Sequence, residues 1–530
     1  MKKISFALLV IICAYFFVAG QQLHLPGLHN DEAQEAGLPA LQMANGSKVS
    51  AFRNIGIGPR HFPLMVQDYI GALHAYFTVP FVTALGPNAT SVRLPALIIG
   101  AITLVLTFGF TRLTWGNGTA LLSTVLLALH PSFVFWSRQG TLIASVTLAF
   151  AMALLWAITQ WCKHGTARWA FLAGLLAGVG VYSKIIFLWI LGGMAGSTLL
   201  LNLHRMLTAR KGFWPRNPTL SSIVAVVAGF SIGITPLLTF HTLSHGAALR
   251  PIGQMFSADT AGWSQLWGRL DHFGAVLTAK NHFWYLGSSP GNPLWLWAFA
   301  LASLAIIIQF ALGFRHGRRG FALFILLILA VLVASFTPTP AGLFPHHLAL
   351  FTPLWATLVA VGSTTVARMT RQNRLAYILI ALSLTALIAG DLKANLHMHR
   401  DLAKSGGEGP HSDAIHILTA KLVSIHPMDT VALDWGIAPQ VRYLSGERIA
   451  PREIFGYGET ADDGFGKRLQ LFFQKHGTVY VLHTPSETIF QRRTEFIKEA
   501  TNLGYTLQKL DVVRNRNGIP IFELFIVNKQ

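Results

Sequence analysis

The sequence predicts an α-helical protein that crosses a membrane many times and carries a small soluble α/β domain at its C-terminus. Three observations predict this architecture. Of the 530 residues, 52% are hydrophobic and only 12% are charged, which is about half the charged share of a soluble domain. Apolar stretches recur at about 20 residues, the length that spans a bilayer. Acidic residues are scarce until His397, after which 15 of the 22 occur. This composition excludes a soluble enzyme, a disordered chain and a fibrous protein.

We predict eleven membrane spans from the apolar stretches. They cover residues 4–20, 94–111, 119–136, 141–160, 169–183, 185–203, 219–239, 293–313, 321–336, 347–366 and 375–391. Residues 69–85 are also apolar, but they contain His74 and Pro80 and precede Gly-Pro, so we expect an interfacial or re-entrant helix. The first stretch could alternatively be a signal peptide; we expect an uncleaved anchor, and either interpretation leaves Gln21 outside.

The distribution of charge orients these spans. If the N-terminus is cytoplasmic, the alternate loops on that side contain basic residues and no acidic one. These basic residues are Lys2, Lys3, Arg112, Lys163, Arg168, Arg205, Arg210, Lys211, Arg216, Arg315, Arg318, Arg319, Arg368, Arg371 and Arg374. All acidic residues before the tail then lie outside, and the basic residues of these short loops lie inside, as the positive-inside rule expects. Counting 69–85 as a span would break this pattern. The net charge of +19 therefore reflects orientation, and we expect no nucleic-acid partner.

We divide the chain into a membrane domain, residues 1–396, and an exterior α/β domain, residues 397–530. The tail alternates strand-like runs such as TVYVLH with a helical run, RRTEFIKEATNLGY, which is typical of an α/β domain. Two exterior loops are long, at about 21–92 and 240–292, and we expect chemistry there. Cys13 and Cys162 lie on opposite sides of the membrane, so we expect no disulfide.

The motif HNDEAQEAG, His29–Gly37, is the sharpest feature of the first loop. Asn30 or Asp31 could cap a short helix, with Glu35 one turn after Asp31 on the same face. The motif then serves structure alone. In the other interpretation, a carboxylate at the membrane surface acts as a general base on a hydroxyl group. The residues by themselves leave both interpretations open.

An Asp-Glu pair just beyond the first span resembles the hallmark of GT-C glycosyltransferases, specifically the branch of protein O-mannosyltransferases and lipid A aminoarabinose transferases. Further segments resemble that branch in the same order. They are PLMVQDYIGALHAYFTVPFVTALG (63–86), SVRLPAL (91–97), LLALHPSFVFWSR (126–138), AGLLAGVGVYSKIIFLW (173–189) and, more weakly, PHHLALFTPL (345–354). The resemblance covers roughly residues 1–240.

This resemblance implies a GT-C-like fold and transfer of a sugar from a polyprenyl-phosphate donor to an acceptor outside the cytoplasmic membrane, with inversion. Asp31 would be the base, and Glu32 a supporting acid or a sugar contact. Positive groups would stabilise the departing phosphate. The candidates near the exterior boundary are Arg60, His61, Arg93, Arg138, Lys184, His346 and His347.

Each of these candidates also has a structural interpretation. Lys184 could extend its ammonium to the interface, and Arg93 and Arg138 could anchor span ends or pair with Asp31 or Glu32. His346 and His347 could be ordinary interface histidines, and we expect His29 to serve local structure.

The sequence departs from some relatives because the stretch RQGTLIASVTL, residues 138–148, contains no acid. A second carboxylate, if one is needed, would then be Asp68, Asp259 or Asp271. We expect no metal site and no required cofactor; participation of a divalent cation stays open, although nothing in the sequence indicates it. In the tail, Asp434-Trp435-Gly436 follows a predicted strand, where a turn is expected more often than a ligand contact.

The partners that follow are a polyprenyl-phosphate sugar donor, a lipid, glycan or protein acceptor, and the bilayer. Short loops and a lysine-rich start suggest a bacterial inner membrane, with a cytoplasmic N-terminus and a periplasmic C-terminal domain. A transporter or lipid-linked sugar flippase is the alternative. Ion-coupled transporters usually carry acids at mid-membrane depth, and no predicted span has one in its interior. A catalytically inactive relative is a third interpretation, which the Asp31-Glu32 pair disfavours.

Overall fold

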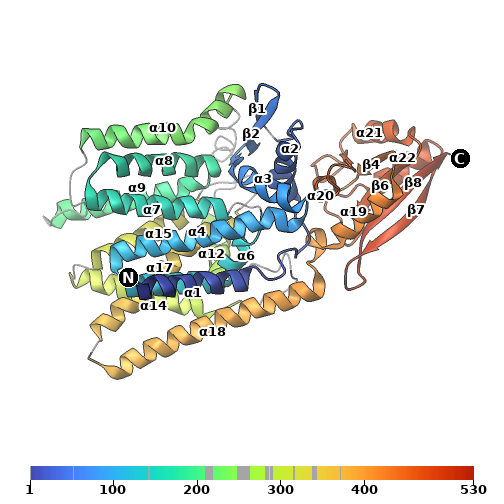
Figure 1. Cartoon of the computed structure of the whole chain (residues 1–530). Helices are drawn as coiled ribbons and strands as arrows, with labels where there is room; N and C mark the ends of the chain where they lie inside the picture. The colour runs from blue at the N-terminus through green and yellow to red at the C-terminus, as the bar shows by residue number, and fades with distance from the viewer. Residues whose placement is uncertain are drawn as a thin grey trace.

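The computed structural model describes residues 2–51, 53–140, 144–208, 219–246, 263–280, 286, 291–313, 317–336, 343–370 and 372–529. It consists of a helical bundle, a folded first loop at one end of the bundle, and a C-terminal α/β domain beyond that loop (Figure 1). The N-terminal end of the first helix lies at the opposite end of the bundle from the C-terminal domain.

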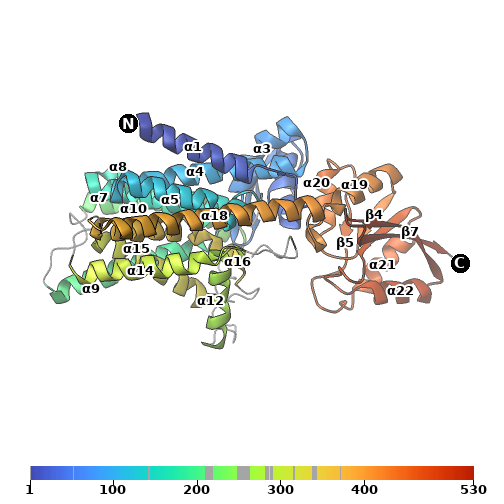
Figure 2. The same ribbon diagram turned by 90° about the horizontal axis from the view of Figure 1, so that it is seen from below.

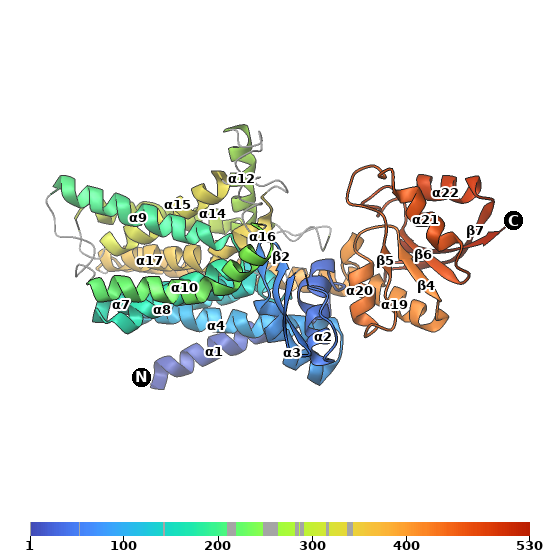
Figure 3. The same ribbon diagram turned by 90° about the horizontal axis from the view of Figure 1, so that it is seen from above.

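Helices occur at all eleven positions where the sequence predicts spans. They are α1 (Lys2–Ala19), α4 (Ala89–Trp115), α5 (Asn117–Leu129) with α6 (Pro131–Ser137), α7 (Ala144–His164), α8 (Ala167–Ser183), α9 (Phe187–Thr208), α10 (Leu220–Leu243), α14 (Leu294–Ala311), α15 (Gly317–Phe336), α16 (Pro345–Leu348) with η4 (Ala349–Phe351) and α17 (Thr352–Met369), and α18 (Arg374–Ser405). Figures 2 and 3 show most of the long helices running along one common direction.

Within the described residues, eight helices are long and apolar enough to cross a membrane, or nine if the bent pair α5–α6 is one span. The pair bends by 65° at His130, because Pro131 begins a new helix whose Ser132 N–H donates to His130 Nδ1. Helices α1 and α8 belong to the shorter apolar helices. Helix α3 (Leu73–Leu85) has 13 residues, about 20 Å at 1.5 Å per residue, which is too short to span.

Small residues allow two helices of the bundle to pack at very short range. A Cβ atom on Gly178 of α8 would lie 2.4 Å from the Phe230 carbonyl oxygen of α10. A Cβ atom on Gly233 of α10 would lie 2.5 Å from the Leu175 carbonyl oxygen of α8. Only glycine permits this backbone approach, which is the usual packing device between helices in a bilayer.

The first loop is a compact layer at the end of the bundle. It contains η1 (Glu32–Gly37), a π-helical segment, then α2 (Leu38–Ala44) and the strands β1 (Arg53–Ile57), β2 (Arg60–Gln67) and β3 (Ile70–Gly71). The strands form an antiparallel sheet in the order β1-β2-β3. Lys184 pairs with Ile70 as an antiparallel bridge, and Ile185 N–H donates to the Tyr69 carbonyl at 3.2 Å. The loop is therefore tied to the break between α8 and α9. In the second long loop, the structure describes α12 (Trp263–Leu277).

The C-terminal domain is built on a five-stranded sheet in the order β5-β4-β6-β8-β7. Its elements are η5 (Gly409–His411), α19 (Ala414–Ile425), β4 (Asp429–Ala432), α20 (Ala438–Leu444), β5 (Arg452–Glu453), α21 (Phe465–Phe473), β6 (Thr478–His483), α22 (Arg493–Asn502), β7 (Tyr505–Arg514) and β8 (Pro520–Lys529). β4 is parallel to β5 and β6, and β8 is antiparallel to β6 and β7. The predicted boundary at residue 397 falls inside α18, which continues without a break to Ser405.

The C-terminal domain contacts the first loop directly. Gly27 N–H donates to the Gly406 carbonyl at 3.2 Å, and Gln42 Nε2 donates to Glu447 Oε1 at 2.7 Å. The buried Tyr443 of α20 packs on Gly37, the last residue of η1. The segment that carries the predicted acids is therefore enclosed between the bundle and the α/β domain (Figure 1).

Candidate active site

A buried ion pair organises the first turn of the loop. Arg93 of α4 donates from Nε to Glu32 Oε1 at 2.8 Å and from Nη2 to Glu32 Oε2 at 2.6 Å. Both residues are 0% exposed. Arg93 also donates to the carbonyls of Leu23, Pro26 and Gly27 at 2.7–3.2 Å. Arg93 therefore binds Glu32 in a bidentate manner and donates its remaining N–H groups to backbone carbonyls, so it holds the start of the first loop against α4.

The Glu32 carboxylate is fully engaged. Besides Arg93, it accepts the backbone N–H of His29 at 2.9 Å and that of Gly140 at 2.7 Å. Burial alone raises the pKa of Glu32, but the charge and hydrogen bonds of Arg93 outweigh it and hold the pKa below its usual range. This geometry favours the structural interpretation of both residues, in which Arg93 anchors a span end by pairing with Glu32.

Asp31 has a different environment. Its side chain is 24% exposed, and it makes no capping hydrogen bond at the start of η1. Its oxygen Oδ1 accepts a hydrogen bond from Asn30 Nδ2 at 3.2 Å, and its oxygen Oδ2 lies 3.7 Å from His29 Nδ1. Its own backbone N–H donates to His29 Nδ1 at 3.1 Å, so that nitrogen is an acceptor and His29 serves the local turn. The Asp31 carboxylate is thus available for chemistry in a way that Glu32 is not.

Lys184 lies at the break between α8 and α9 and is 2% exposed. Its Nζ lies 5.7 Å from the centre of the Tyr69 ring, within cation–π range. Burial lowers the pKa of Lys184, while the nearby carboxylates of Glu35 and Asp31 oppose this shift. A lysine that reached water by snorkelling would expose its ammonium group, so this burial favours the interpretation as a site residue.

Glu35 joins the site as a residue that the sequence analysis placed on the face of Asp31 but did not select. It is buried and accepts a hydrogen bond from Gln67 Nε2 of β2. Burial, together with the charges of Glu35 and Asp31, raises the pKa of the Tyr69 hydroxyl, so these three side chains lie within electrostatic range of one another. The spacing of four residues was the signal that could have identified Glu35.

His346 and His347, in the short helix α16, approach the same region. Their ring centres are 4.0 Å apart, and the charge of Lys184 acts on both rings. His347 Nδ1 accepts the Phe344 N–H at 3.2 Å. The bundle therefore brings two imidazole rings near Lys184, although 162 positions along the chain separate Lys184 from His346.

Arg138 also has contacts that are structural. It is 0% exposed, and its Nη2 donates to the carbonyls of Gln21 at 2.7 Å and Gln22 at 2.6 Å. Its Nη1 lies 3.5 Å from His399 Nδ1 on α18. These contacts favour the interpretation in which Arg138 anchors a span end, here the turn after α1.

The other predicted residues lie apart from Asp31 or nearby without a defined role. Arg60 and His61 begin β2 at the tip of the β1–β2 hairpin, and Arg60 is seven positions from Gln67 along the strand, a length of about 23 Å. Asp68 is partly buried in the turn next to Tyr69. Asp271 is exposed on α12. Asp259 lies outside the described residues.

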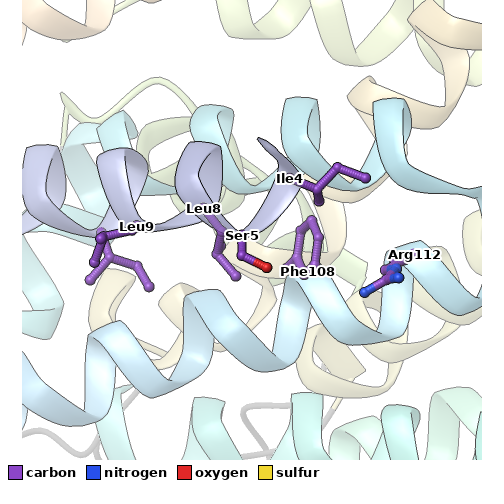
Figure 4. Close-up of a pocket in the computed structure, with 7 residues that line it drawn as sticks. Ile4, Ser5, Leu8, Leu9, Phe108 and Arg112 are labelled. Atoms are coloured by element: carbon purple, nitrogen blue, oxygen red, sulfur yellow. The ribbon is translucent and has the colours of Figure 1, made fainter. Parts of the chain in front are cut away.

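A pocket at the other end of the bundle is unrelated to these acids. It lies between the first half of α1 and the end of α4 and is lined by Ile4, Ser5, Leu8, Leu9, Ile12, Phe108 and Arg112 (Figure 4). Its lining is mainly aliphatic and contains no carboxylate. This pocket therefore contributes nothing to chemistry at Asp31.

Comparison with protein families finds one match. Residues 71–231 match the family described as dolichyl-phosphate-mannose-protein mannosyltransferase. This region contains Arg93, Arg138 and Lys184 but not Asp31. A comparison with the sequences of curated proteins finds no match.

Solved structures resemble the chain over nearly its whole length. ArnT from Cupriavidus metallidurans, bound to undecaprenyl phosphate, has a TM-score of 0.60 and 13% identity, covering 99% of this chain and 98% of that one. Archaeal oligosaccharyltransferase AglB from Archaeoglobus fulgidus, in complex with an inhibitory peptide and a dolichol-phosphate, has a TM-score of 0.55 and 12% identity, covering 99% of this chain and 74% of that one. The chain therefore shares the overall fold of ArnT and AglB over nearly its whole length, at low sequence identity.

Proposed function

We propose that this protein is a membrane glycosyltransferase that moves a sugar from a polyprenyl-phosphate donor to an acceptor on the exterior face of the cytoplasmic membrane. Asp31 is the general base, and transfer inverts the anomeric carbon. The observation that carries the proposal is the partly exposed Asp31 carboxylate within electrostatic range of the buried Lys184, at one end of the helical bundle. No metal or cofactor is required.

The donor class is supported by what the similar proteins have in common. The ArnT structure contains undecaprenyl phosphate, the AglB structure contains a dolichol-phosphate, and the matching family is described by dolichyl-phosphate-mannose. Each is a phosphate on a long isoprenoid chain. The basic loops that contain no acid support a cytoplasmic N-terminus, which puts the Asp31 end of the bundle outside, in a bacterium the periplasm.

The chemistry follows from the charges at the site. The acceptor hydroxyl gives its proton to the Asp31 carboxylate while its oxygen attacks the anomeric carbon. The bond between that carbon and the phosphate oxygen breaks, and its electron pair leaves with the phosphate. One carboxylate suffices for inversion, because no covalent sugar–enzyme intermediate forms.

Lys184 supplies the positive charge for the departing phosphate, and His346 and His347 add N–H donors. Because Lys184 is buried, its attraction for a phosphate is much stronger than in water. Burial lowers the pKa of Lys184, and the Glu35 and Asp31 carboxylates oppose that shift by favouring its charged form.

The proposal is tested with purified protein in detergent and radiolabelled polyprenyl-phosphate sugars, by measuring sugar release to water or to crude envelope acceptors. Asp31→Asn removes nearly all turnover at unchanged abundance in the membrane. Asp463→Asn, which changes an exposed aspartate of the C-terminal domain just before α21, is the matched control and keeps wild-type turnover. Retained activity in Asp31→Asn would refute the assignment of the base.

The same assay tests Lys184. We expect Lys184→Met to lower turnover by about 10²-fold, the cost of one donor to a developing negative charge, whereas Lys184→Arg keeps part of the activity. Wild-type protein that binds none of the lipid phosphates and cleaves none of them would favour a transporter or flippase instead.

A further inference from the structure

The sheet of the C-terminal domain contains a topological switch point. After β4 the chain enters α20, which packs on one face of the sheet with Val441 against Ala432 and Val479. After the neighbouring parallel strand β6 the chain enters α22, which packs on the other face with Phe496 against Tyr480. Two adjacent parallel strands whose connections depart to opposite faces leave a crevice at their carboxyl ends, which is the usual ligand position in such sheets.

An Asp-His pair lies at this crevice. Asp434 follows β4 and His483 ends β6, with Asp434 Oδ2 2.9 Å from His483 Nδ1. Asp434 also accepts the backbone N–H groups of Trp435, Ile489 and Phe490 at 2.8–3.0 Å. Its carboxylate is therefore saturated, and His483 Nδ1 carries the hydrogen that it donates. In the neutral ring, Nε2 is left as an acceptor.

Three buried polar atoms at this crevice lack a hydrogen-bond partner among the described residues. They are His483 Nε2 and both side-chain amide atoms of Gln440, and both residues are 0% exposed. Both side chains lie near Gly436: a Cβ atom there would lie 3.7 Å from Pro410 Cβ, 3.8 Å from Gln440 Nε2 and 3.9 Å from His483 Cε1. Buried polar groups are nearly always hydrogen-bonded, since an unmet one is costly. The two acceptors and one donor that these two side chains leave unpartnered thus indicate a binding site for a polar group.

The crevice is adjacent to the segment that carries Asp31. Trp435 lies between Asp434 and Gly436, and its ring centre is 5.6 Å from that of His29, two residues before Asp31. The ring of His411, in η5, stacks on the His29 ring, with 4.7 Å between the ring centres. Trp435 remains partly exposed. The α/β domain therefore places an aromatic ring and the unpartnered polar atoms next to the proposed base.

We propose that this crevice binds the hydroxyl groups of an uncharged carbohydrate, and that this carbohydrate belongs to the acceptor. The assignment of this carbohydrate to the acceptor rests on the proposed function. A sugar hydroxyl donates to His483 Nε2 and to Gln440 Oε1 and accepts from Gln440 Nε2, and a sugar ring stacks on an indole face. A charged ligand does not fit as well, because the Asp434 charge is already compensated by four donors.

The experiment uses the full chain in lipid nanodiscs and saturation-transfer NMR with six neutral saccharides: glucose, mannose, galactose, N-acetylglucosamine, cellobiose and chitobiose. Gln440→Leu removes both amide atoms at nearly constant volume. His483→Asn keeps a donor toward Asp434 and removes the Nε2 acceptor. Gln474→Leu, an exposed glutamine at the end of α21, is the matched control.

We expect at least one saccharide to bind wild type and Gln474→Leu equally, and to bind Gln440→Leu and His483→Asn about tenfold more weakly, the effect of a lost hydrogen bond. Gln440→Leu should melt no lower than wild type, because it removes two unpaired buried atoms, so its loss of binding is not a loss of fold. Binding of no saccharide, or equal binding to all four proteins, would overturn the proposal and leave ordered water as the partner of these atoms.

Donor cleavage in the same preparations separates this proposal from the proposed function. Loss of cleavage in Asp31→Asn, with saccharide binding retained, supports both. Saccharide binding by a wild-type protein that cleaves no donor supports the crevice while refuting the glycosyltransferase assignment.

Discussion

Replacing Arg93 by methionine tests whether the Arg93–Glu32 pair anchors the first loop. The substitution keeps an unbranched stem, two heavy atoms shorter than that of arginine, and removes five hydrogen bonds, two to Glu32 and three to backbone carbonyls. It leaves the Glu32 carboxylate at 0% exposure with only two backbone N–H donors. Removing one partner of a buried pair costs about 3–5 kcal/mol. The three orphaned carbonyls add about 1 kcal/mol each at most, since such costs are not additive among neighbours.

The assay is unfolding of the purified protein in mixed detergent micelles, followed by tryptophan fluorescence. Arg112→Met is the matched control, because Arg112 is exposed near the other end of the same helix, and we expect a change within about 0.5 kcal/mol. In the double variant Arg93→Met/Glu32→Gln, the loss should fall short of the sum of the single losses by about 2 kcal/mol. If Arg93→Met is no more destabilising than Arg112→Met, the pair is not an anchor, and a phosphate-binding role for Arg93 becomes the better interpretation.

Two further predictions concern the same loop. Arg93 holds the pKa of Glu32 below its usual range, so ionised Glu32 stabilises the fold at pH above about 4.5. This contribution is lost as the pH falls through the lower pKa of the folded state. The melting temperature of Glu32→Gln should therefore change less with decreasing pH than that of wild type. Gly37→Ala places a Cβ atom 2.9 Å from the Tyr443 ring, so we expect a loss of about 1–3 kcal/mol from overpacking and lower turnover through displacement of Asp31. Adding Tyr443→Leu should restore the melting temperature, and a melt of Gly37→Ala identical to wild type would contradict this packing.

The architecture could be predicted because it depends on properties of short segments. Hydropathy and length identify helices that must satisfy their backbone in a bilayer, and helices occur at all eleven predicted positions. The α/β tail and the non-spanning helix at 69–85 followed from local patterns of the same kind. The bend at Pro131 and the continuation of α18 to Ser405 did not, because packing against other elements decides where a helix bends or ends.

The candidate site could be predicted only in part. The sequence selected Asp31, Lys184 and the His346-His347 pair, and the fold brings them to one end of the bundle. It treated Asp31 and Glu32 as one acidic pair, whereas one carboxylate is partly exposed and the other is buried against Arg93. Neighbouring residues on a helical turn point in different directions, and only the position of Arg93 decides which of the two is neutralised.

The sequence by itself determined that this chain is a polytopic membrane protein, where its helices lie, and which few acids could do chemistry, because hydrophobic length and charge act locally. Tertiary structure alone decided which basic residues face the site. Arg93 and Arg138 donate hydrogen bonds to backbone carbonyls that lie about 70 and about 115 residues away in the chain. Lys184, in contrast, lies within electrostatic range of Glu35 and Asp31. Hydrogen-bond partners that distant are set by helix packing, which no local pattern of residues contains.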